Sequence, residues 1–360
     1  MARIFSFGAG LVGSYICDQL GKQGHEVTAV AIAHSNVPLI DEVRGNLQFE
    51  ILEFDAFSYL DSNDIDDYDL ILNLLPGRIG DSIREHLISN GHNVCDLAFS
   101  EKSPNWLSKL AKKNGSNMLH DCGIAPGLSN MVVASEQIGK KPLKSVRIRV
   151  GGNPIDCDDE WNYFAPFSPT DVIEEYSRPA RIRKNGIEIE VPAISDRHLL
   201  LAGNYGEMEA FLTDGLRSLL ENQKITSKSL SEYTIRWPGH IDKFIKLRED
   251  GVIDEESLVK EWRYTADKIE FTYMDITIEK MDGTKIIWTF DIPGIDVQKG
   301  RFWPSMAVAT GIPFLVGCEA LLNGEIIGIQ SPDEYYSDVD KIVKRLQDAG
   351  SIISRVEIDN

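Results

Sequence analysis

A glycine-rich string near the N-terminus has the spacing of a turn that binds a dinucleotide pyrophosphate. It reads Gly8-Ala9-Gly10-Leu11-Val12-Gly13 and follows an apolar run over residues 4–7. The first glycine suits a tight turn, the second lets the backbone approach the phosphates, and the third lets a helix pack closely on the strand. A helix expected over residues 14–23 would direct free N–H groups and its positive dipole end at the anion. The string therefore predicts a nucleotide site; a glycine-rich turn without a ligand is the alternative.

Two aspartates, Asp96 and Asp121, are expected to end neighbouring strands at the same edge of one sheet. Ligands of open α/β sheets lie outside the carboxyl ends of the strands. A carboxylate partly buried beside a cofactor has its pKa raised toward the working pH, where it can act as a general base or bind an amine. The alternative for each is an aspartate that caps a loop. Asp121 is the better placed, because it opens an unusual string, DCGIAPG, that leads from a strand into a helix.

Three further polar side chains lie near these motifs. Cys122 either lines the site or fills a small space in the packing. His120 should point away from Asp121, because neighbours along a strand alternate faces, and we interpret it as structural. His240, in the string RWPGH, is a candidate for a substrate contact, with a histidine that stabilises a turn as the alternative.

The residues after the second strand bear on the choice between NAD and NADP. An acid there binds the ribose 2′-OH of NAD and repels the 2′-phosphate of NADP. Here the segment reads AVAIAHSN and has no acid, while Ser35 and Asn36 can hydrogen-bond a phosphate and His34 can add positive charge. No arginine is adjacent, so both cofactors stay open, with a slight preference for NADP that rests on the missing acid. A second group of expected cofactor contacts follows the fourth strand: Asn73, Leu74, Leu75 and Pro76.

The elements that position these residues alternate between strand and helix over residues 1–122. Strands are expected over residues 4–7, 26–33, 47–54, 69–75, 93–97 and 117–121. The fourth, DLILNLL, is nearly all apolar, as a strand covered on both faces must be. Helices are expected from Ile79, with Ile83 and Leu87 on the same face, and from Pro104, which suits a first helical turn. This alternation predicts an α/β fold with a doubly wound parallel sheet of the Rossmann type.

The pattern changes after residue 122. A linking helix is expected over residues 127–139, followed by strands in which apolar and polar residues alternate, as over residues 146–150 and 286–292. We therefore expect a second, α+β domain with a largely antiparallel sheet over residues 123–304, whose uncovered face would suit a homodimer. Helices are expected again over residues 305–360, packed on the dinucleotide-binding domain of residues 1–122.

Composition narrows the class of protein. A chain of 360 residues suggests two domains, and 42% hydrophobic with 26% charged residues is typical of a globular protein. The net charge of −19 argues against nucleic-acid and membrane partners and mildly favours a cationic substrate, although acidity that only aids solubility is the simpler explanation.

The five cysteines have no metal-binding spacing, so no metal is expected and the thiols should be reduced, as in the cytoplasm. MARIFSFG has no signal-peptide pattern, and the apolar stretch 306–322 is short and interrupted, typical of a buried helix.

The chain resembles the saccharopine dehydrogenase superfamily, and within it the lysine 6-dehydrogenase branch. The most specific motifs are DCGIAPGLSN, residues 121–130, and RWPGH, residues 236–240. Others occur in the family order: GAGLVG at residues 8–13, GGNP at 151–154, EAFLT at 209–213 and ATG at 309–311.

This resemblance implies a two-domain, dimeric enzyme that uses NAD or NADP to oxidise the CH–NH bond of an amino acid. A lysine ε-amine has an ordinary pKa of about 10.4, so a base must remove its proton before hydride can leave. We assign this base, or an ammonium anchor, to Asp121, with Asp96 as its partner. The resemblance also implies that Tyr163, Phe167 and Thr213 line the substrate pocket from the second domain. Cys122, Arg236 and His240 are further candidates for substrate contacts.

Two departures from the family pattern leave alternatives open. His34 replaces the acid that lysine 6-dehydrogenases carry after the second strand, so the preference for NAD is not assured. Asp214 stands near the place where saccharopine reductases carry an arginine for a substrate carboxylate, which favours a substrate with an amine there. The alternatives are a saccharopine dehydrogenase or reductase, a carboxynorspermidine-type imine reductase, and a non-catalytic dinucleotide-binding sensor.

Overall fold

The computed structural model describes residues 1–32, 40–137, 139–156, 161–266 and 268–359. The chain forms two compact units: unit 1 comprises residues 1–131 and 307–342, and unit 2 comprises residues 132–306 and 343–360. The sequence prediction divided the chain between residues 122 and 123 and kept residues 305–360 together. By its contacts the chain instead divides within helix α6 (Leu128–Gln137), and its last part belongs to unit 2.

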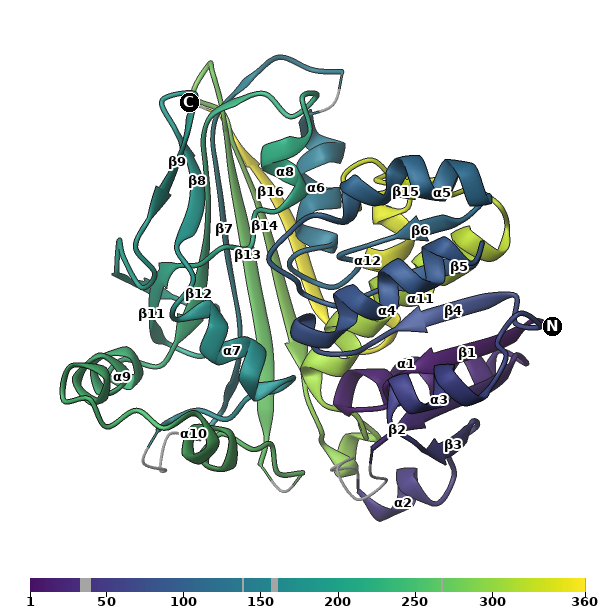
Figure 1. Cartoon of the computed structure of the whole chain (residues 1–360). Coiled ribbons are helices and arrows are strands. Elements are labelled where there is room, and N and C mark those ends of the chain that lie inside the picture. The colour runs from purple at the N-terminus through teal and green to yellow at the C-terminus, as the bar shows by residue number, and fades with distance from the viewer. Residues whose placement is uncertain (33–39, 138, 157–160, 267, 360) are drawn as a thin grey trace. The chain divides into compact units, whose positions relative to one another are not determined.

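Unit 1 is built on a seven-stranded parallel sheet with the order β15-β6-β5-β4-β1-β2-β3 (Figure 1). Its strands are β1 (Arg3–Phe7), β2 (Glu26–Ala31), β3 (Glu50–Glu53), β4 (Leu70–Asn73), β5 (Asn93–Asp96), β6 (Asn117–Leu119) and β15 (Ile329–Gln330). The order reverses at β1, which lies between β2 and β4. This is the predicted doubly wound, Rossmann-type sheet, extended by the short late strand β15, which pairs in parallel with β6.

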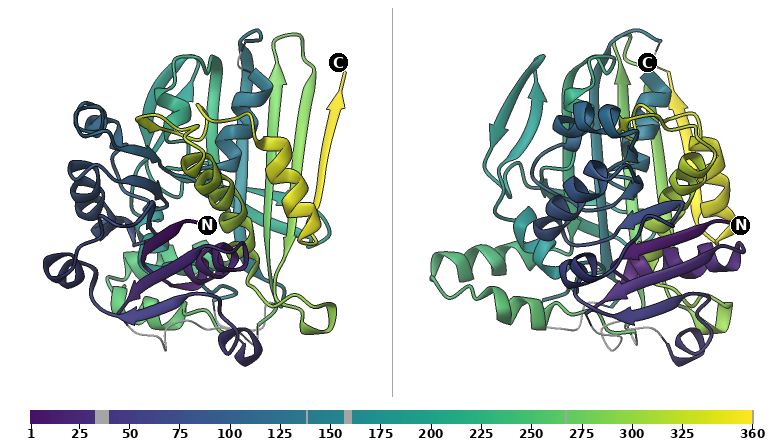
Figure 2. Two further views of the ribbon diagram at one scale, coloured as in Figure 1. Left: turned by 90° about the vertical axis from the view of Figure 1, so that its right-hand side faces the viewer. Right: turned by 45° about the vertical axis from the view of Figure 1, so that its right-hand side comes forward.

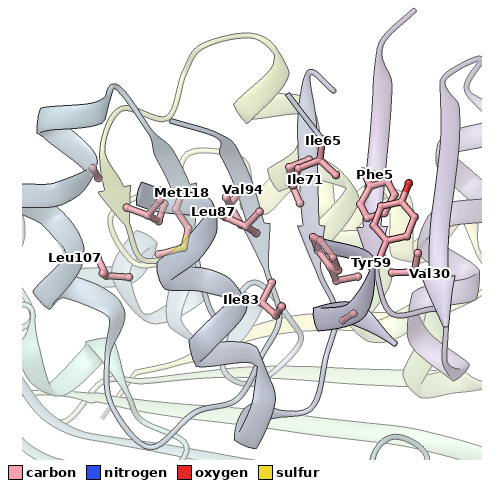
Figure 3. Close-up of a cluster of buried hydrophobic side chains, with 14 residues drawn as sticks. Phe5, Val30, Tyr59, Ile65, Ile71, Ile83, Leu87, Val94, Leu107 and Met118 are labelled. Carbon is pink, nitrogen blue, oxygen red and sulfur yellow. The ribbon is translucent and has the colours of Figure 1, made fainter. Parts of the chain in front are cut away.

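Helices cover both faces of the first sheet. One face carries α3 (Ala56–Ser62), α4 (Gly77–Ser89), a 3-10 turn (Pro104–Leu107) and α5 (Ser108–Asn114). Between these helices and the strands, 14 buried side chains form one apolar cluster (Figure 3). The strands contribute alternate residues to it, as period-two geometry requires. The other face carries α1 (Leu11–Lys22) and α11 (Ser305–Leu322), and a short helix α2 (Asp41–Arg44) precedes β3.

Helix α11 is long and apolar enough to cross a membrane, by length and composition alone, but 83% of it is buried inside the protein. Two glycines explain how closely it packs. A Cβ at Gly311 would lie 2.4 Å from the ring of Tyr15, and one at Gly317 would lie 2.7 Å from the side chain of Leu119. The helix is therefore part of the core, as its interrupted apolar sequence predicted.

Unit 2 contains a nine-stranded sheet in which most neighbouring strands are antiparallel (Figure 1). The main path is β10-β11-β12-β7-β13-β14-β16, with β8 pairing β12 and β9 pairing β8; β12 and β7 are parallel. The strands are β7 (Leu143–Pro154), β8 (Ala180–Lys184), β9 (Ile187–Val191), β10 (His198–Leu201), β11 (Glu207–Leu212), β12 (Ser227–Arg236), β13 (Glu270–Lys280), β14 (Lys285–Pro293) and β16 (Ile352–Ile358). The sheet is the largely antiparallel one predicted for the α+β domain.

Most of the helices after residue 131 are short. They are α7 (Pro169–Glu175), α8 (Ser218–Glu221), α9 (His240–Glu249), α10 (Glu255–Glu261), a 3-10 turn (Val297–Lys299) and α12 (Val339–Asp348). The division between the units falls within α12, as it does within α6.

The C-terminal strand is where the prediction of helices through residue 360 fails. Figure 2 shows β16 at the edge of the second sheet, where it pairs antiparallel with β14. Its sequence IISRVEI is rich in β-branched residues, which favour a strand. Arg355 of β16 donates to Glu136 of α6 at 2.7 Å, and Trp288 of β14 donates to the same carboxylate at 3.0 Å. These contacts fix the last strand to unit 2.

Candidate active site

The turn between β1 and α1 contains two glycines that packing requires and one that it does not. Gly8 has φ of +102°, and a Cβ there would lie 2.8 Å from the carbonyl oxygen of Leu74. A Cβ at Gly13 would lie 3.1 Å from the carbonyl oxygen of Gly8. A Cβ at Gly10, by contrast, would meet no described atom within 4 Å. The open space beside Gly10 therefore fits a ligand that closely approaches the backbone, as a pyrophosphate does.

Hydroxyl groups order the same turn. The Ser6 hydroxyl donates to the carbonyl oxygen of Gly8 at 2.8 Å, and the Ser14 hydroxyl donates to that of Ala9 at 2.7 Å. Helix α1 begins at Leu11, so its first backbone N–H groups follow directly on the glycine turn. The turn is thus held in a shape that directs N–H groups at an anion.

The structure describes one group of the remaining predicted cofactor contacts, the loop after β4, but not the segment after β2. Leu74, Leu75 and Pro76 are half-buried after β4, and the backbone N–H of Leu74 donates to Phe7 at 2.9 Å, which holds this loop beside the glycine turn. His34, Ser35 and Asn36 lie outside the described residues, so the choice between NAD and NADP stays a prediction.

Asn73 and Asp96, which end the neighbouring strands β4 and β5, join one buried network with helix α4. Arg84 donates to both carboxylate oxygens of Asp96, from Nε at 2.9 Å and from Nη2 at 2.8 Å. The Asn73 amide and the backbone N–H of Ala98 donate to the same carboxylate at 2.7 and 2.9 Å. Asp96 is fully buried. With four hydrogen bonds on its two oxygens, it is a rigid anchor for the strand ends.

Arg84 was not singled out from the sequence. Burial lowers the pKa of its guanidinium, but the Asp96 carboxylate outweighs that effect and raises the pKa. Gly80, one helical turn earlier, makes room for this packing, since a Cβ there would lie 2.3 Å from the Cβ of Ala98. The available signal was helical periodicity, which places Arg84 on the same face of α4 as Gly80 and Leu87.

The prediction that His120 points away from Asp121 is wrong. Strand β6 ends at Leu119, and Asp121 has φ of 54°, in the left-handed region. The alternation of faces therefore stops before these residues, and Nδ1 of His120 lies 3.2 Å from Oδ2 of Asp121. Both side chains are buried. The structure thus places a histidine beside the predicted base.

Cys122 lies in the core against α11, where its Sγ is 3.5 Å from the carbonyl oxygen of Pro313 and has no exposed surface. Burial raises the pKa of its neighbour Cys95 well above the usual value, and it raises that of Cys17 to about 12. This placement favours the packing interpretation of Cys122. Within the described ranges, no group of three or more His, Cys, Asp or Glu residues is arranged to hold a metal ion.

In unit 2 the predicted residue Arg236, at the end of β12, is buried between aromatic rings. Its guanidinium lies 4.4 Å from the ring centre of Tyr163 and 5.8 Å from that of Tyr176. Nε donates to the Tyr176 hydroxyl at 2.8 Å, and Nη2 donates to the Tyr163 hydroxyl at 3.3 Å. The nearest carboxylate among its described partners is Glu175, at 4.0 Å. Arg236 is therefore held mainly by neutral groups.

The same network contains the predicted residue His240 and extends to two aromatic residues that sequence reasoning missed. The Tyr176 hydroxyl lies 3.0 Å from Nε2 of His240, and Nδ1 of His240 lies 3.1 Å from the carbonyl oxygen of Trp161. Burial raises the pKa of Tyr176 to about 12, so the hydroxyl stays protonated. Phe167 packs against the edge of this aromatic cluster. Neither Tyr176 nor Trp161 stands in a motif that would have marked it.

A row of polar side chains lies on one face of β12. Because alternate residues share a face, Glu232, Thr234 and Arg236 point the same way. Thr213, predicted to bind substrate, joins the row through its hydroxyl, which lies 3.0 Å from that of Thr234. Burial raises the pKa of Glu232 to about 8, helped by the charge of Glu175. Oε2 of Glu232 is buried and accepts no hydrogen bond from any described residue.

A family model, the saccharopine dehydrogenase C-terminal domain, matches residues 123–352. The match includes the aromatic cluster, the β12 row and α11, and it spans more than half of the chain. The chain belongs to the saccharopine dehydrogenase family.

Two solved structures have a similar fold. The apo saccharopine dehydrogenase (L-Glu forming) of Saccharomyces cerevisiae is 17% identical, with a TM-score of 0.74 over 99% of this chain and 100% of that one. The homospermidine synthase of Legionella pneumophila, solved in complex with NAD, is 11% identical, with a TM-score of 0.70 over 100% of this chain and 92% of that one. At these identities the similarity establishes the fold, and the branch of the saccharopine dehydrogenase family stays open.

One expectation for a member of the saccharopine dehydrogenase family is not supported. Asp214 was interpreted as favouring a substrate amine, but Arg181 donates to both of its oxygens at 2.9 Å. Asp214 is buried, and the guanidinium of Arg181 already compensates its charge inside the protein.

Proposed function

We propose that this protein is an NAD(P)-dependent dehydrogenase that oxidises the CH–NH bond of lysine or a lysine-like amine, as in the lysine 6-dehydrogenase branch. The observation that carries the proposal is the β12 row. Oε2 of Glu232 is buried and accepts no hydrogen bond from any described residue, and the charge of Arg217 does not outweigh the effect of burial on this carboxyl, while Arg236 on the same face is held mainly by tyrosine hydroxyls. A buried charge is costly unless it is paired. A substrate with both an amine and a carboxylate would supply both partners.

The glycine turn supports a dinucleotide cofactor. Gly10 leaves space beside the backbone, and the first turn of α1 offers N–H groups to a pyrophosphate. Bound there, NAD or NADP would accept the hydride. We retain the slight preference for NADP, which rests on the absence of an acid in the segment His34 to Asn36.

The chain's own residues would act on the proton and on the position of the substrate. The amine must lose its proton before it can release hydride, and we assign this proton transfer to Asp121. Asp96 is bound to Arg84, so we assign it the role of fixing the strand ends beside Asp121. Water would then hydrolyse the imine product.

Cofactor reduction by purified protein tests the proposal directly. NAD and NADP are each supplied with lysine, ornithine, saccharopine and aliphatic diamines, and reduced cofactor is followed by its absorbance. We expect turnover with lysine or a close analogue. The control is G10A, which should keep wild-type stability because its Cβ meets no described atom within 4 Å, and should lose at least ~10-fold in cofactor affinity. No turnover of any amine or imine in either direction would contradict the proposal.

Two other functions have specific support. A saccharopine dehydrogenase or reductase would use Arg236 for a substrate carboxylate, and a carboxynorspermidine-type imine reductase would use Glu175 and Glu232 for a diamine. The substrate panel separates them. A non-catalytic dinucleotide sensor would bind cofactor without turnover, and Asp121→Asn, which should abolish turnover and spare cofactor binding, tests the assigned base.

We also propose that the enzyme is a cytoplasmic homodimer that pairs through the edge of its second sheet. Ile352, Val356 and Ile358 of β16 are about half or more exposed and share one face with Ile287 of β14. Exposed apolar residues on an edge strand favour pairing with another chain. Light scattering should therefore give a dimer for wild type and a monomer for V356D; a wild-type monomer would contradict this.

A further inference from the structure

We propose that His120 and Asp121 work as one acid–base pair, in which Asp121 takes a proton from the substrate ammonium group and His120 holds that carboxylate and shares the proton. The inference rests on the proposed function and names a positioning residue for it. In this step one N–H bond of the ammonium group breaks and one O–H or N–H bond forms on the pair. No electrons are exchanged in it.

The contact between the two side chains is made by an unusual backbone. Neighbours on a strand face opposite ways, so His120 and Asp121 would not meet if β6 continued. Asp121 adopts φ of 54°, a left-handed conformation that costs a residue other than glycine about 1–2 kcal/mol. The backbone N–H of Gly123 donates to the carbonyl oxygen of Asp121 at 3.1 Å and so holds this conformation. The result is a separation of 3.2 Å between Nδ1 of His120 and Oδ2 of Asp121.

The burial of His120 is difficult to explain by packing. The ring has no exposed surface, and neither Nδ1 nor Nε2 makes a hydrogen bond that meets geometric criteria with any described residue. A buried polar atom left without a hydrogen bond costs about 1–3 kcal/mol, so an apolar side chain would serve the core better. The close carboxylate on one side of the ring and the unbonded Nε2 on the other are what a proton-sharing histidine requires.

The other ionisable groups near the pair are poorly suited to share a proton with Asp121. Arg84 of α4 feels the charge of Asp121, but its own guanidinium is bound by Asp96 at 2.8 and 2.9 Å and also by Asp81. On the neighbouring strand β5, the thiol of Cys95 lies beside Cys122 and Cys318, and burial raises its pKa well above the usual value, so it carries no charge near neutral pH. His120, with Nδ1 3.2 Å from Oδ2, lies within reach to share a proton with Asp121.

A second buried histidine provides a matched control. His92, just before β5, lies with Nε2 3.6 Å from Asp66, a pair of the same residue types. Asp66 is exposed, and the pair lies where β5 begins, whereas His120 and Asp121 follow the end of β6. Burial lowers the pKa of His92. Replacing His92 therefore removes a buried histidine without touching the edge of the sheet where the ligand is expected.

The test is the pH profile of kcat/KM for amine oxidation in wild type, H120F, H120N and H92F. We expect H120F to lose at least ~10-fold in kcat, as for loss of a proton-transfer group. The low-pH side of its kcat/KM profile, where activity falls as the base becomes protonated, should move to lower pH. The reason is that an ordinary carboxylate releases its proton about 2–3 pH units below an imidazole. H120N keeps an N–H donor near the position of Nδ1, so it should recover part of kcat and keep the displaced limb. H92F should match wild type.

The outcomes separate this inference from the proposed function. Wild-type turnover with an unchanged profile in H120F, or in H120N if H120F does not fold, would overturn the pair and leave the dehydrogenase intact. A wild type without turnover would contradict the dehydrogenase. In that case the imidazole ¹⁵N resonances still report on the contact: those of His120 should move in D121N and those of His92 should not. Unmoved His120 resonances would overturn the pair.

Discussion

Two buried arginines that lie near strand ends, Arg84 in unit 1 and Arg236 in unit 2, have opposite kinds of hydrogen-bond partner. In unit 1, Arg84 is held by the carboxylates of Asp96 and Asp81. In unit 2, Arg236 donates to two tyrosine hydroxyls and to the backbone carbonyl of Ile235, with Glu175 at 4.0 Å. Both guanidiniums have almost no exposed surface. The first charge is neutralised by carboxylates within the fold, whereas the second is surrounded mainly by the dipoles of hydroxyl and carbonyl groups.

The contrast shows how to distinguish a structural charge from a functional one when both are buried. Removing one member of a buried ion pair is strongly destabilising mainly because the other charge is left buried without a partner. A cation surrounded by hydroxyls and ring faces is less well compensated, so it gains more from a ligand carboxylate. Substitution at the two positions should therefore separate effects on stability from effects on catalysis.

The largest effect should come from Arg84→Met. Asp96 would be left buried without its cation, which costs about 3–5 kcal/mol in the free energy of unfolding. Thermal or denaturant unfolding measures this. The double variant R84M/D96N removes both charges and should recover part of the loss. If the single and double variants were equally unstable, the ion pair would not be the cause.

Arg236→Met should show the opposite balance. Its partners are hydroxyls, so the free energy of unfolding should fall by only about 1–3 kcal/mol. Loss of a charged hydrogen bond to substrate should raise KM for a carboxylate-bearing amine by about 10- to 100-fold. Steady-state kinetics and melting curves, run beside R84M, check both. A variant as unstable as R84M with an unchanged KM would make Arg236 a second structural arginine.

Glu232→Gln tests the other end of the β12 row through pH. The folded-state pKa of about 8 lies above the ordinary value, so between about pH 5 and pH 8 the native state holds a proton that the unfolded state has released. The stability due to this proton is therefore lost as pH rises through that window. E232Q lacks this dependence, so relative to wild type it should gain about 1.4 kcal/mol per pH unit, or roughly 4 kcal/mol across the window. Denaturant unfolding at both ends of the window measures the gain, and parallel curves would contradict the burial of an unpaired carboxyl.

The smallest effect should come from Tyr163→Phe. It removes a hydroxyl that accepts from Arg236 at 3.3 Å but keeps the ring 4.4 Å from the guanidinium. We expect a loss of about 0.5–1 kcal/mol in unfolding free energy and a small rise in KM. Y176F is the matched variant, because its hydroxyl meets both Arg236 and His240. Y176F should cost more than Y163F in both measurements.

The sequence was sufficient for the features that depend on local pattern. The glycine string fixed the first turn, and apolar periodicity predicted both sheets, because these signals act over a few residues. It was insufficient where a residue's partner comes from a distant element. The ion pair between Arg84 and Asp96 depends on the close approach of Gly80 to Ala98, which no local pattern encodes.

The error at His120 has a different origin. Alternation of faces was a sound rule, but it was applied beyond the end of β6, where the left-handed backbone of Asp121 reverses it. Tyr176 and Trp161 were missed because single aromatic residues outside motifs give no sign that they share a network. Arg236 and His240, by contrast, were found through the family string that contains both.

The return of residues 307–342 to unit 1 affects how the protein folds during synthesis. When a ribosome has made the first 131 residues, the apolar side chains of Tyr15 and Leu119 still await Gly311 and Gly317 of α11. The β6 edge likewise awaits β15. The core of unit 1 cannot be completed until residues 307–342 have been synthesised, after most of unit 2. Until then, a nascent or truncated chain leaves the apolar surface that α11 covers exposed to solvent. Unit 1 expressed alone would have to contain both residues 1–131 and residues 307–342.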